Sequence, residues 1–283
     1  GCGRMGAFTS QAVHDFAPDC WFPLSHIEAM LACESVDLQA ACDLDPVTLS
    51  RVATRYQSLE LFQRYEKMLQ EVHPQILSVA TRTQERAQII EAAIQMGVRG
   101  FHVEKPLCNS VEQLNQLRDL IDNNGIALSY GAIRRHFQIY KKAKELIESG
   151  ELGELKEIQV NFGTGQLFWT HPHSVDLILF FAGNREFRGA SGHLSDVVFQ
   201  SKNKIESDPV VDHAILHFHD GVVGTIGRGF GMDIMIHCGK GIVVVGADGS
   251  FLSVKRSQTD NPYYEFPGEL QSVEKLPLEG TYA

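Results

Sequence analysis

The sequence predicts an α/β chain of two domains. The first is a doubly wound parallel sheet over residues 1–130, and the second is an α+β domain with a mainly antiparallel sheet over residues 131–283. Strand-like and helix-like segments alternate as far as Tyr130, which is typical of a parallel sheet with crossover helices. After Asn184 short apolar runs follow one another across turns such as 219–221, which is typical of antiparallel strands. At about 100–200 residues per domain, a length of 283 residues agrees with two domains.

In the first domain, strands are expected at short apolar runs and helices where apolar residues recur every three or four positions. Ser110 is a predicted N-cap with Gln113 in the capping-box position, and Gly125 is the predicted end of the same helix. In chain order we expect a strand over 36–42, a helix over 47–56, a strand over 75–80, a helix over 83–96, a strand over 100–103, a helix over 110–125 and a strand over 126–130.

In the second domain we expect two helices separated by one strand, followed by an antiparallel meander. Gly150 and Gly183 are the predicted ends of the helices. The helices are expected over 139–149 and 174–181, and the strands over 155–162, 214–218, 222–227, 234–237, 242–245 and 251–254.

Composition excludes several classes of protein. The chain is 43% hydrophobic and 21% charged, so a sizeable core can form. With 25 basic and 35 acidic residues its net charge is −10, which argues against nucleic acid or an acidic membrane as a partner. No apolar run reaches the length of a membrane span. Six cysteines are scattered without a Cys-x-x-Cys pair, so we expect no disulfide scaffold or structural zinc, and a cytoplasmic location.

The first six residues, Gly1-Cys2-Gly3-Arg4-Met5-Gly6, fit the pattern G-x-G-x-x-G. In dinucleotide-binding proteins this pattern makes a tight turn that lets the backbone approach a pyrophosphate. We therefore predict that Gly1, Gly3, Arg4, Met5 and Gly6 bind a cofactor, an ordinary glycine turn being the alternative. The strand expected before this turn is not in the sequence, and we expect native residues beyond both ends.

An acidic residue follows the second predicted strand, where a dinucleotide site needs one. The carboxylate of Asp43 could accept hydrogen bonds from the adenosine ribose and would repel a 2′-phosphate, which favours NAD over NADP. The alternative role is the N-cap of the helix that follows. The gap from Gly6 to Asp43 exceeds the usual spacing, and residues 15–25 are the expected insertion.

Several further segments, taken with the glycine turn and Asp43, resemble one oxidoreductase family. These segments are 97–107, which contains Glu104-Lys105-Pro106, then 150–153, and 173–177 with Gly183. On them the chain resembles the glucose–fructose oxidoreductase / inositol dehydrogenase family (Gfo/Idh/MocA). The resemblance implies an N-terminal Rossmann domain and a C-terminal domain with an open, mainly antiparallel sheet, through which we expect a homo-oligomer.

The resemblance also implies roles for individual residues. Lys105 would lie beside the nicotinamide and the reacting carbon as a catalytic residue, with Glu104 fixing its position in the cofactor site. Thr81 would place its backbone near the nicotinamide ribose. His173 would be the acid/base or a substrate ligand, and Asp176 its structural neighbour. The alternatives are a solvated surface lysine for Lys105 and a structural histidine for His173.

The chain also departs from the family pattern. Trp169 stands four residues before His173, where many members have Asp and some Tyr; it cannot act as an acid or base, but it could stack on a sugar ring. His171 could substitute but is expected to point elsewhere. Arg86 stands where the family usually has His, and Arg82 where it usually has Pro; Arg82 could contact an anionic group or lie in solvent.

Two further groups of side chains have open roles. Arg134, Arg135 and His136 could bind an anionic substrate group or pair with surface acids, and we take Arg135 as the substrate-binding candidate. His171 with His173, and His217 with His219, resemble metal pairs but lack a third ligand at a recognised spacing, so no metal is predicted.

Together these features predict a cytoplasmic NAD-dependent oxidoreductase, with NADP the less favoured cofactor. It would transfer hydride between the nicotinamide and a hydroxyl-bearing carbon of a sugar, polyol or sugar derivative. Lys105 and His173 would be catalytic, and Arg135, Trp169 and His173 would bind substrate. The alternatives are an NAD-requiring glycosidase or epimerase that oxidises its substrate transiently, and a non-catalytic regulatory protein that binds the cofactor.

Overall fold

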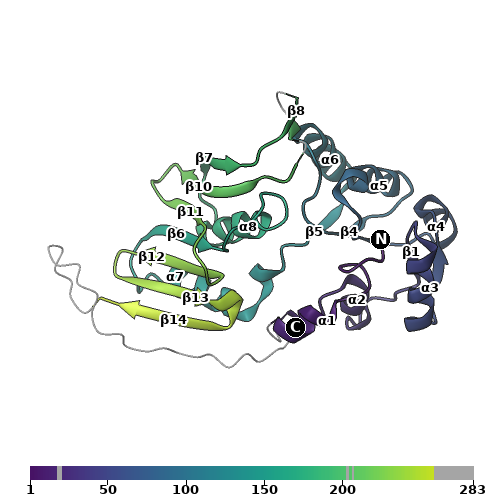
Figure 1. The fold of residues 1–283 in the computed structure, drawn as a ribbon, viewed down its shortest axis with the longest axis horizontal. Helices are drawn as coiled ribbons and strands as arrows, with labels where there is room; N and C mark the ends of the chain where they lie inside the picture. Colours follow the sequence, from purple (N-terminus) through teal and green to yellow (C-terminus); the bar gives the residue numbers. More distant parts are fainter. Residues whose placement is uncertain (18–20, 202–203, 206, 258–283) are drawn as a thin grey trace. The chain divides into compact units, whose positions relative to one another are not determined.

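The computed structural model describes residues 1–17, 21–201, 204–205 and 207–257 (Figure 1). The chain forms two compact units, Gly1–Gly131 and Ala132–Ala283. Each unit has its own sheet system and its own buried apolar side chains. In the described parts of the chain, no helix combines the length and the apolar character that crossing a bilayer requires.

The first unit alternates helices and short parallel strands. Its elements are α1 (Gln11–Phe16), α2 (His26–Leu31), β1 (Ala40–Cys42), α3 (Pro46–Arg55), β2 (Glu60–Phe62), α4 (Tyr65–Val72), β3 (Ile76–Val79), α5 (Thr83–Gln95), β4 (Gly100–Val103), α6 (Val111–Asn124) and β5 (Ala127–Tyr130). The helices α1, α2 and α4 and the strand β2 were not anticipated from the sequence, because they are short.

The parallel strands of the first unit form two separate groups. Strand β1 pairs with β2, and β4 lies between β3 and β5. Helices α4 and α5 pack on these strands with Leu69, Ile90 and Ala93 fully buried. The facing edges of β1 and β3 have no strand between them among the described residues.

Local capping signals explain where the helices of this unit begin and end. The Ser110 side chain accepts from the Gln113 amide at 3.1 Å, and Gly125 ends α6 in the left-handed conformation (φ 60°). Asp45 caps α3 by accepting from the amides of Val47 and Thr48. The sequence alternative, in which Asp43 is this N-cap, is therefore wrong.

The predicted insertion lies between the glycine turn and α2. The amide of His26 donates to the Met5 carbonyl at 2.8 Å, and that of Ile27 donates to the Gly6 carbonyl at 2.9 Å. Helix α2 thus follows the turn directly in space, although 19 positions separate Gly6 from Ser25 in the sequence. Ser25 is the N-cap of α2 and forms a capping box with Glu28. The inserted segment accordingly begins nearer to Gly6 than the expected range of 15–25.

The second unit has a seven-stranded sheet with two long helices on one face, and a separate two-stranded sheet formed by β8 and β9. Its elements are η2 (Ile133–His136), α7 (Gln138–Glu148), β6 (Leu155–Asn161), α8 (His171–Ala182), β7 (Phe187–Ser195), β8 (Phe199–Ser201), β9 (Lys204–Ile205), β10 (Val210–Phe218), β11 (Val223–Gly227), β12 (Asp233–Cys238), β13 (Gly241–Gly246), η3 (Ala247–Gly249) and β14 (Phe251–Arg256).

The sheet of the second unit is not the simple meander that the sequence suggested. Its order is β14-β13-β12-β6-β11-β10-β7, so the early strand β6 lies in the middle. Strand β6 pairs parallel with β11 and antiparallel with β12. The sheet is mainly antiparallel, as predicted, with one parallel pair that hydrophobic patterning alone does not reveal.

Packing on one face of this sheet fixes the positions of α7 and α8. A Cβ on Gly224 of β11 would lie 2.2 Å from the Ile178 side chain of α8, so only glycine allows the helix so close to the strand. Helix α8 begins at His171, three residues before the predicted start at Ser174, because Pro172 is accepted in its first turn. His171 and His173 therefore both belong to this helix.

Candidate functional site

The glycine turn has the geometry of a phosphate cradle. A Cβ on Gly6 would lie 2.0 Å from the Gly1 carbonyl oxygen, and one on Gly1 would lie 2.9 Å from the Ala80 carbonyl oxygen. A Cβ on Gly3 would meet no atom within 4 Å. The turn therefore needs glycine at positions 1 and 6 for its own packing, whereas Gly3 leaves open space beside the backbone, as close approach of a pyrophosphate requires.

Asp43 is held against this turn. One of its carboxylate oxygens accepts the Cys2 amide at 2.7 Å and the other accepts the Asp45 amide at 2.9 Å. Asp43 follows β1, so the end of that strand and the glycine turn are tied together. Each carboxylate oxygen keeps a further lone pair, which leaves the side chain able to accept a ribose hydroxyl.

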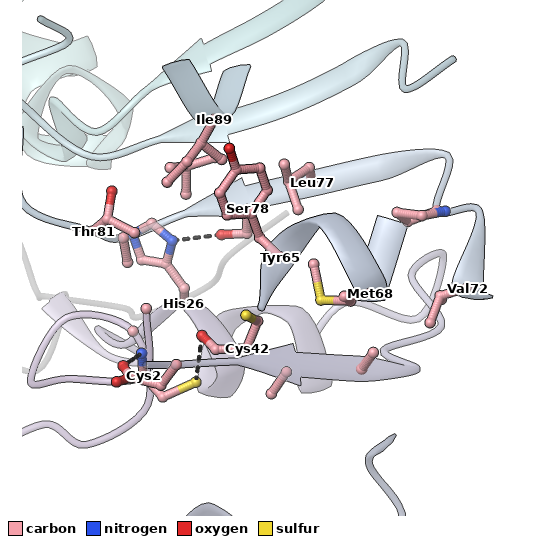
Figure 2. A pocket seen from close by; sticks show the side chains of 18 of the residues that line it. Cys2, His26, Cys42, Tyr65, Met68, Val72, Leu77, Ser78, Thr81 and Ile89 are labelled. Carbon is pink, nitrogen blue, oxygen red and sulfur yellow. Dashed lines mark hydrogen bonds between the residues drawn. The ribbon is translucent and has the colours of Figure 1, made fainter. Parts of the chain in front are cut away.

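One cavity of about 1120 Å³ in the first unit is lined by most of the predicted cofactor-binding residues. Figure 2 shows part of this lining, including Thr81. The lining includes Gly1, Gly3, Gly6, Asp43 and Thr81. The lining also includes residues along the facing edges of β1 and β3. The volume of the cavity is therefore larger than the volume of a cofactor site at the glycine turn alone. Arg4, Met5, Glu104 and Lys105 are outside the lining of this cavity.

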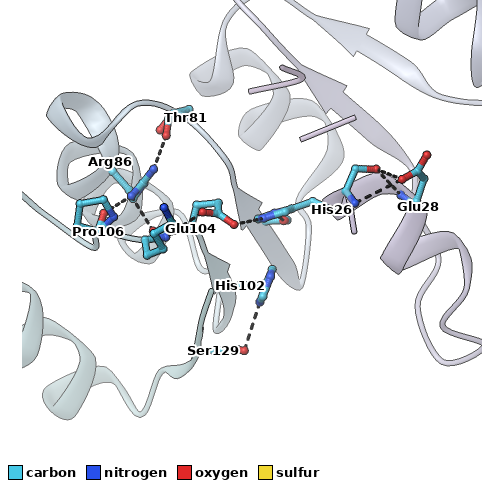
Figure 3. Close-up of polar contacts among 11 residues, drawn as sticks. His26, Glu28, Thr81, Arg86, His102, Glu104, Pro106 and Ser129 are labelled. Carbon is cyan, nitrogen blue, oxygen red and sulfur yellow. Dashed lines mark hydrogen bonds and ion pairs between the residues drawn. The ribbon is translucent and has the colours of Figure 1, made fainter. Parts of the chain in front are cut away.

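Glu104 lies just beyond β4, in a polar network that begins at His26 (Figure 3), and Lys105 follows it in the chain. His26 is buried and reaches Ser78 of β3 through Nδ1 at 2.5 Å and the Glu104 carboxylate through Nε2 at 3.4 Å. The other Glu104 oxygen accepts the Lys105 amide at 3.2 Å. Lys105 is half-buried. The sequence reasoning missed His26, because only the fold shows that it follows the glycine turn in space.

Glu104 makes this network sensitive to acid. Burial raises the pKa of its carboxyl, but the hydrogen bond from His26 and the charges of His26, Lys105 and Arg86 outweigh burial, so the pKa lies below its usual 4.5. An acid with a lowered folded-state pKa stabilises the fold above its unfolded pKa, and that contribution disappears as the pH falls through the folded value.

We therefore expect Glu104→Gln to lower the free energy of unfolding by about 1–3 kcal/mol at pH 7. The difference from the parent should shrink steadily below pH 4.5 in urea denaturation. Glu66→Gln, which changes an exposed carboxylate paired with Arg64, is the matched control. A difference that is constant from pH 7 to pH 3 would contradict this assignment.

Arg86, which stands where the family usually has His, is buried in α5, within the helix predicted over 83–96. Its guanidinium donates to the carbonyls of Thr81, Glu104 and Pro106. Arg82, at the N-cap of α5, is exposed and lines the cavity. Thr81 thus has its carbonyl taken by Arg86, and its hydroxyl donates to the Arg82 carbonyl at 3.2 Å.

The remaining candidates lie in the second unit, around η2 and α8. Arg135 is held by Asp176 in a two-pronged pair, with Nε–Oδ2 at 3.0 Å and Nη2–Oδ1 at 2.6 Å. Burial raises the pKa of Asp176, and Arg135 acts in the opposite direction. Asp176 is therefore the structural partner that the sequence suggested, although its partner is Arg135.

The two histidines of α8 differ in their surroundings. His171 is 1% exposed and shares a 3.0 Å hydrogen bond with Ser174, which makes it the structural histidine. His173 is half-buried, with Nδ1 enclosed, and Trp169 just before the helix is 55% exposed. No group of three or more His, Cys, Asp or Glu side chains that could hold a metal is found among the residues that the structure describes.

Comparison with curated proteins finds distant relatives. The uncharacterized oxidoreductase C115.03 of Schizosaccharomyces pombe is 26% identical over 116 residues, which are 41% of this chain and 31% of that protein. A 1-carboxy-3-chloro-3,4-dihydroxycyclohexa-1,5-diene dehydrogenase of Comamonas testosteroni is 24% identical over 168 residues, covering 53% of this chain and 42% of that protein. The matches thus span less than half the length of these relatives.

Solved structures share the fold across both units. GenD2 from gentamicin A biosynthesis, in complex with NAD, has a TM-score of 0.66 at 22% identity, covering 78% of this chain and 68% of that chain. Levoglucosan dehydrogenase with NADH and L-sorbose has a TM-score of 0.65 at 19% identity, covering 80% and 68%. A Gal80p mutant of Saccharomyces cerevisiae has a TM-score of 0.67 at 16% identity, covering 84% and 73%.

The family model described as "Oxidoreductase family, NAD-binding Rossmann fold" matches residues 1–132. This match covers the glycine turn, Asp43, Thr81 and the Glu104-Lys105-Pro106 segment, and it agrees with NAD as the cofactor. Residues 1–132 thus match the model of the Gfo/Idh/MocA oxidoreductase family, and the solved structures above share the fold of this chain.

Proposed function

We propose that this chain is an NAD-dependent oxidoreductase that transfers hydride between the nicotinamide and a hydroxyl-bearing carbon of a sugar, polyol or sugar derivative. The observation that supports it is the grouping of an open glycine turn, Asp43 and Thr81 around one cavity, with the Lys105 turn tied to Thr81 by Arg86. The likeness to a levoglucosan dehydrogenase adds support for the substrate class.

In this proposal the residues of the first unit bind the cofactor and stabilise the reacting oxygen of the substrate. The backbone at Gly3 faces the pyrophosphate, and Asp43 accepts the ribose hydroxyls. The bound nicotinamide supplies the hydride acceptor or donor at C4. The ammonium of Lys105 donates a hydrogen bond to the substrate oxygen and so stabilises the negative charge that develops when the hydroxyl loses its proton.

The residues of the second unit are proposed as substrate contacts. His173 takes the hydroxyl proton, since a neutral imidazole nitrogen can accept it as a general base. Trp169, which is 55% exposed, has an aromatic ring on which a sugar can stack. Asp176 already occupies Nε and Nη2 of Arg135, so an anionic substituent at this edge of the guanidinium would have to compete with a carboxylate of the protein. A neutral sugar or polyol is therefore the favoured substrate.

The first test is a titration of the purified protein with NADH and NADPH, followed by nicotinamide fluorescence and melting temperature. Tight NADH binding with weak NADPH binding, then NADH formation with a member of a sugar and polyol panel, would support the proposal. Binding without turnover on the whole panel would favour the regulatory alternative, which the likeness to Gal80p also raises. Cofactor retention without net NADH formation would favour transient oxidation. Binding of neither cofactor would refute all three.

The glycine turn offers a prediction that separates binding from folding. Because Gly3 faces open space, Gly3→Val should keep the melting temperature within about 2 °C of the parent and weaken NADH binding at least about a hundredfold by filling the pyrophosphate position. Gly6→Val should lower the melting temperature as well, because its side chain would collide with the Gly1 carbonyl. Unchanged NADH affinity in Gly3→Val would place the cofactor elsewhere.

We also propose that the chain self-associates through the sheet of the second unit. The face opposite α7 and α8 carries half-buried apolar side chains at Ile215, Val223, Met235 and Val244. Met235 and Val244 are paired neighbours on β12 and β13. The double variant Met235→Lys/Val244→Lys should sediment as a monomer, whereas Leu179→Lys on α8 should leave the parent's oligomeric state unchanged. A parent that sediments as a monomer at all concentrations would refute this proposal.

A further inference from the structure

Arg86 joins two loops that a Rossmann sheet otherwise leaves separate. Thr81 follows β3 and Lys105 follows β4, and α5 is the crossover helix between these two strands. In such a unit the start of the helix lies at the carboxyl ends of the strands. Arg86 is the fourth residue of α5, so it lies in the helix turn nearest to both loops.

The contacts of Arg86 are unusual for an arginine. It is 3% exposed, and its terminal nitrogens donate to three main-chain carbonyls: Nη1 to Glu104 at 2.6 Å and to Pro106, and Nη2 to Thr81 (Figure 3). Arginine usually pairs with a carboxylate. Here the carbonyls before and after Lys105 converge on one nitrogen, and the Thr81 carbonyl binds the other.

Only a guanidinium can make this arrangement. Its planar fork presents several donors in fixed directions, whereas a lysine ammonium is a single centre and a neutral histidine has one donor. Burying the charge of the guanidinium costs free energy unless hydrogen bonds or an opposite charge compensate for the lost water. Burial lowers the pKa of Arg86, and the nearby Glu104 carboxylate counteracts this. The Nε atom has no hydrogen-bond partner among the described residues, so the binding is concentrated at the terminal nitrogens.

We propose that Arg86 is a positioning residue, which fixes the main chain on both sides of Lys105 relative to Thr81. This inference rests on the proposed function, since it matters for catalysis only if Lys105 acts on the substrate. Arg86 touches neither reactant. It acts by holding the Lys105 turn, and a shift of about 1 Å in a reacting group can lower a rate about a hundredfold.

Amide hydrogen exchange of the full chain without cofactor tests the positioning directly. In Arg86→Met, peptides that contain Thr81 and residues 104–108 should exchange at least about tenfold faster, while the peptide of α6 keeps its rate. The exchange rates of Arg86→Lys should fall between those of Arg86→Met and those of the parent. If Arg86→Met does not fold, Arg86→Lys replaces it in every measurement. Arg99→Met is the matched control, because Arg99 also donates to carbonyls (Ile94 and Val98) in the same unit but lies outside these loops. Parent-like exchange at both loops would overturn the proposal.

A double-mutant cycle with Lys105 distinguishes positioning from a purely structural role. With the substrate found in the panel, Arg86→Met should lower kcat about 10–100-fold and change the NADH dissociation constant less than about threefold. In a Lys105→Met background the same change should have almost no further effect on kcat, because the group being positioned is gone. Additive losses in the double variant would show a structural role only and overturn the inference. A parent-like kcat in Lys105→Met alone would instead refute the proposed role of Lys105.

Discussion

Replacing Lys105 by methionine is expected to lower kcat for hydride transfer about a thousandfold, within the range of positioned acid–base groups. The variant should bind NADH within about threefold of the parent, because Gly3 and Asp43 supply the proposed cofactor contacts and Lys105 lies outside their cavity. Steady-state rates with the substrate from the panel and fluorescence titration with NADH measure the two effects separately.

Two companion variants make the result specific. Lys67→Met, which removes an exposed lysine paired with Glu71 on α4, should retain the parent rate. Lys105→Arg keeps the positive charge but changes the geometry, and it should recover only part of the lost rate. A loss of NADH binding in Lys105→Met that matches its loss of rate would show that the lysine holds the cofactor rather than the reacting oxygen.

Replacing Arg134 by methionine is expected to lower the free energy of unfolding of the second unit by about 3–5 kcal/mol, because it leaves a buried carboxylate without its charge partner. Arg134 binds Asp248 through Nε at 2.6 Å and Nη2 at 2.7 Å, and both side chains are nearly enclosed. The hydrogen bonds raise the pKa of Arg134 even though burial opposes them. Urea denaturation monitored by circular dichroism measures the loss.

A second substitution tests the cause of this loss. Adding Asp248→Asn to Arg134→Met should restore part of the stability, because no uncompensated charge is then buried, and asparagine tolerates the positive φ of 54° at this position. Arg228→Met breaks a pair with Asp212 that is half exposed, and it should cost no more than about 1 kcal/mol. Equal losses in Arg134→Met and Arg228→Met would contradict the assignment of Arg134–Asp248 as a buried pair.

Much of the candidate site could be predicted because its signals are short. The glycine spacing from Gly1 to Gly6 defines a turn within six residues, and Asp43 is found by its place directly after an apolar strand. Helix α6 was bounded correctly because Ser110 and Gly125 act on the nearest turn of the helix. Each of these predictions depends on residues a few positions apart, whose interactions differ little between folds.

Other features depend on contacts between distant parts of the chain. The sequence left open whether Asp43 binds a ribose or caps the following helix, and only the three-dimensional contacts assign the cap to Asp45 and join Asp43 to the glycine turn. It placed Arg86 in a helix, but nothing nearby in the sequence shows that three carbonyls surround its guanidinium. It also missed His26, whose partners Ser78 and Glu104 lie 52 and 78 positions away.

By itself the sequence determined the two kinds of sheet, the glycine turn and the identity of the residues that can do acid–base chemistry. The tertiary structure decided which of them are held and by what: β6 in the middle of its sheet, Arg135 bound to Asp176, and Arg134 enclosed with Asp248, 114 positions away. The reason is that periodicity and capping act over single turns of the backbone, whereas strand order and buried ion pairs are set by packing across the whole unit.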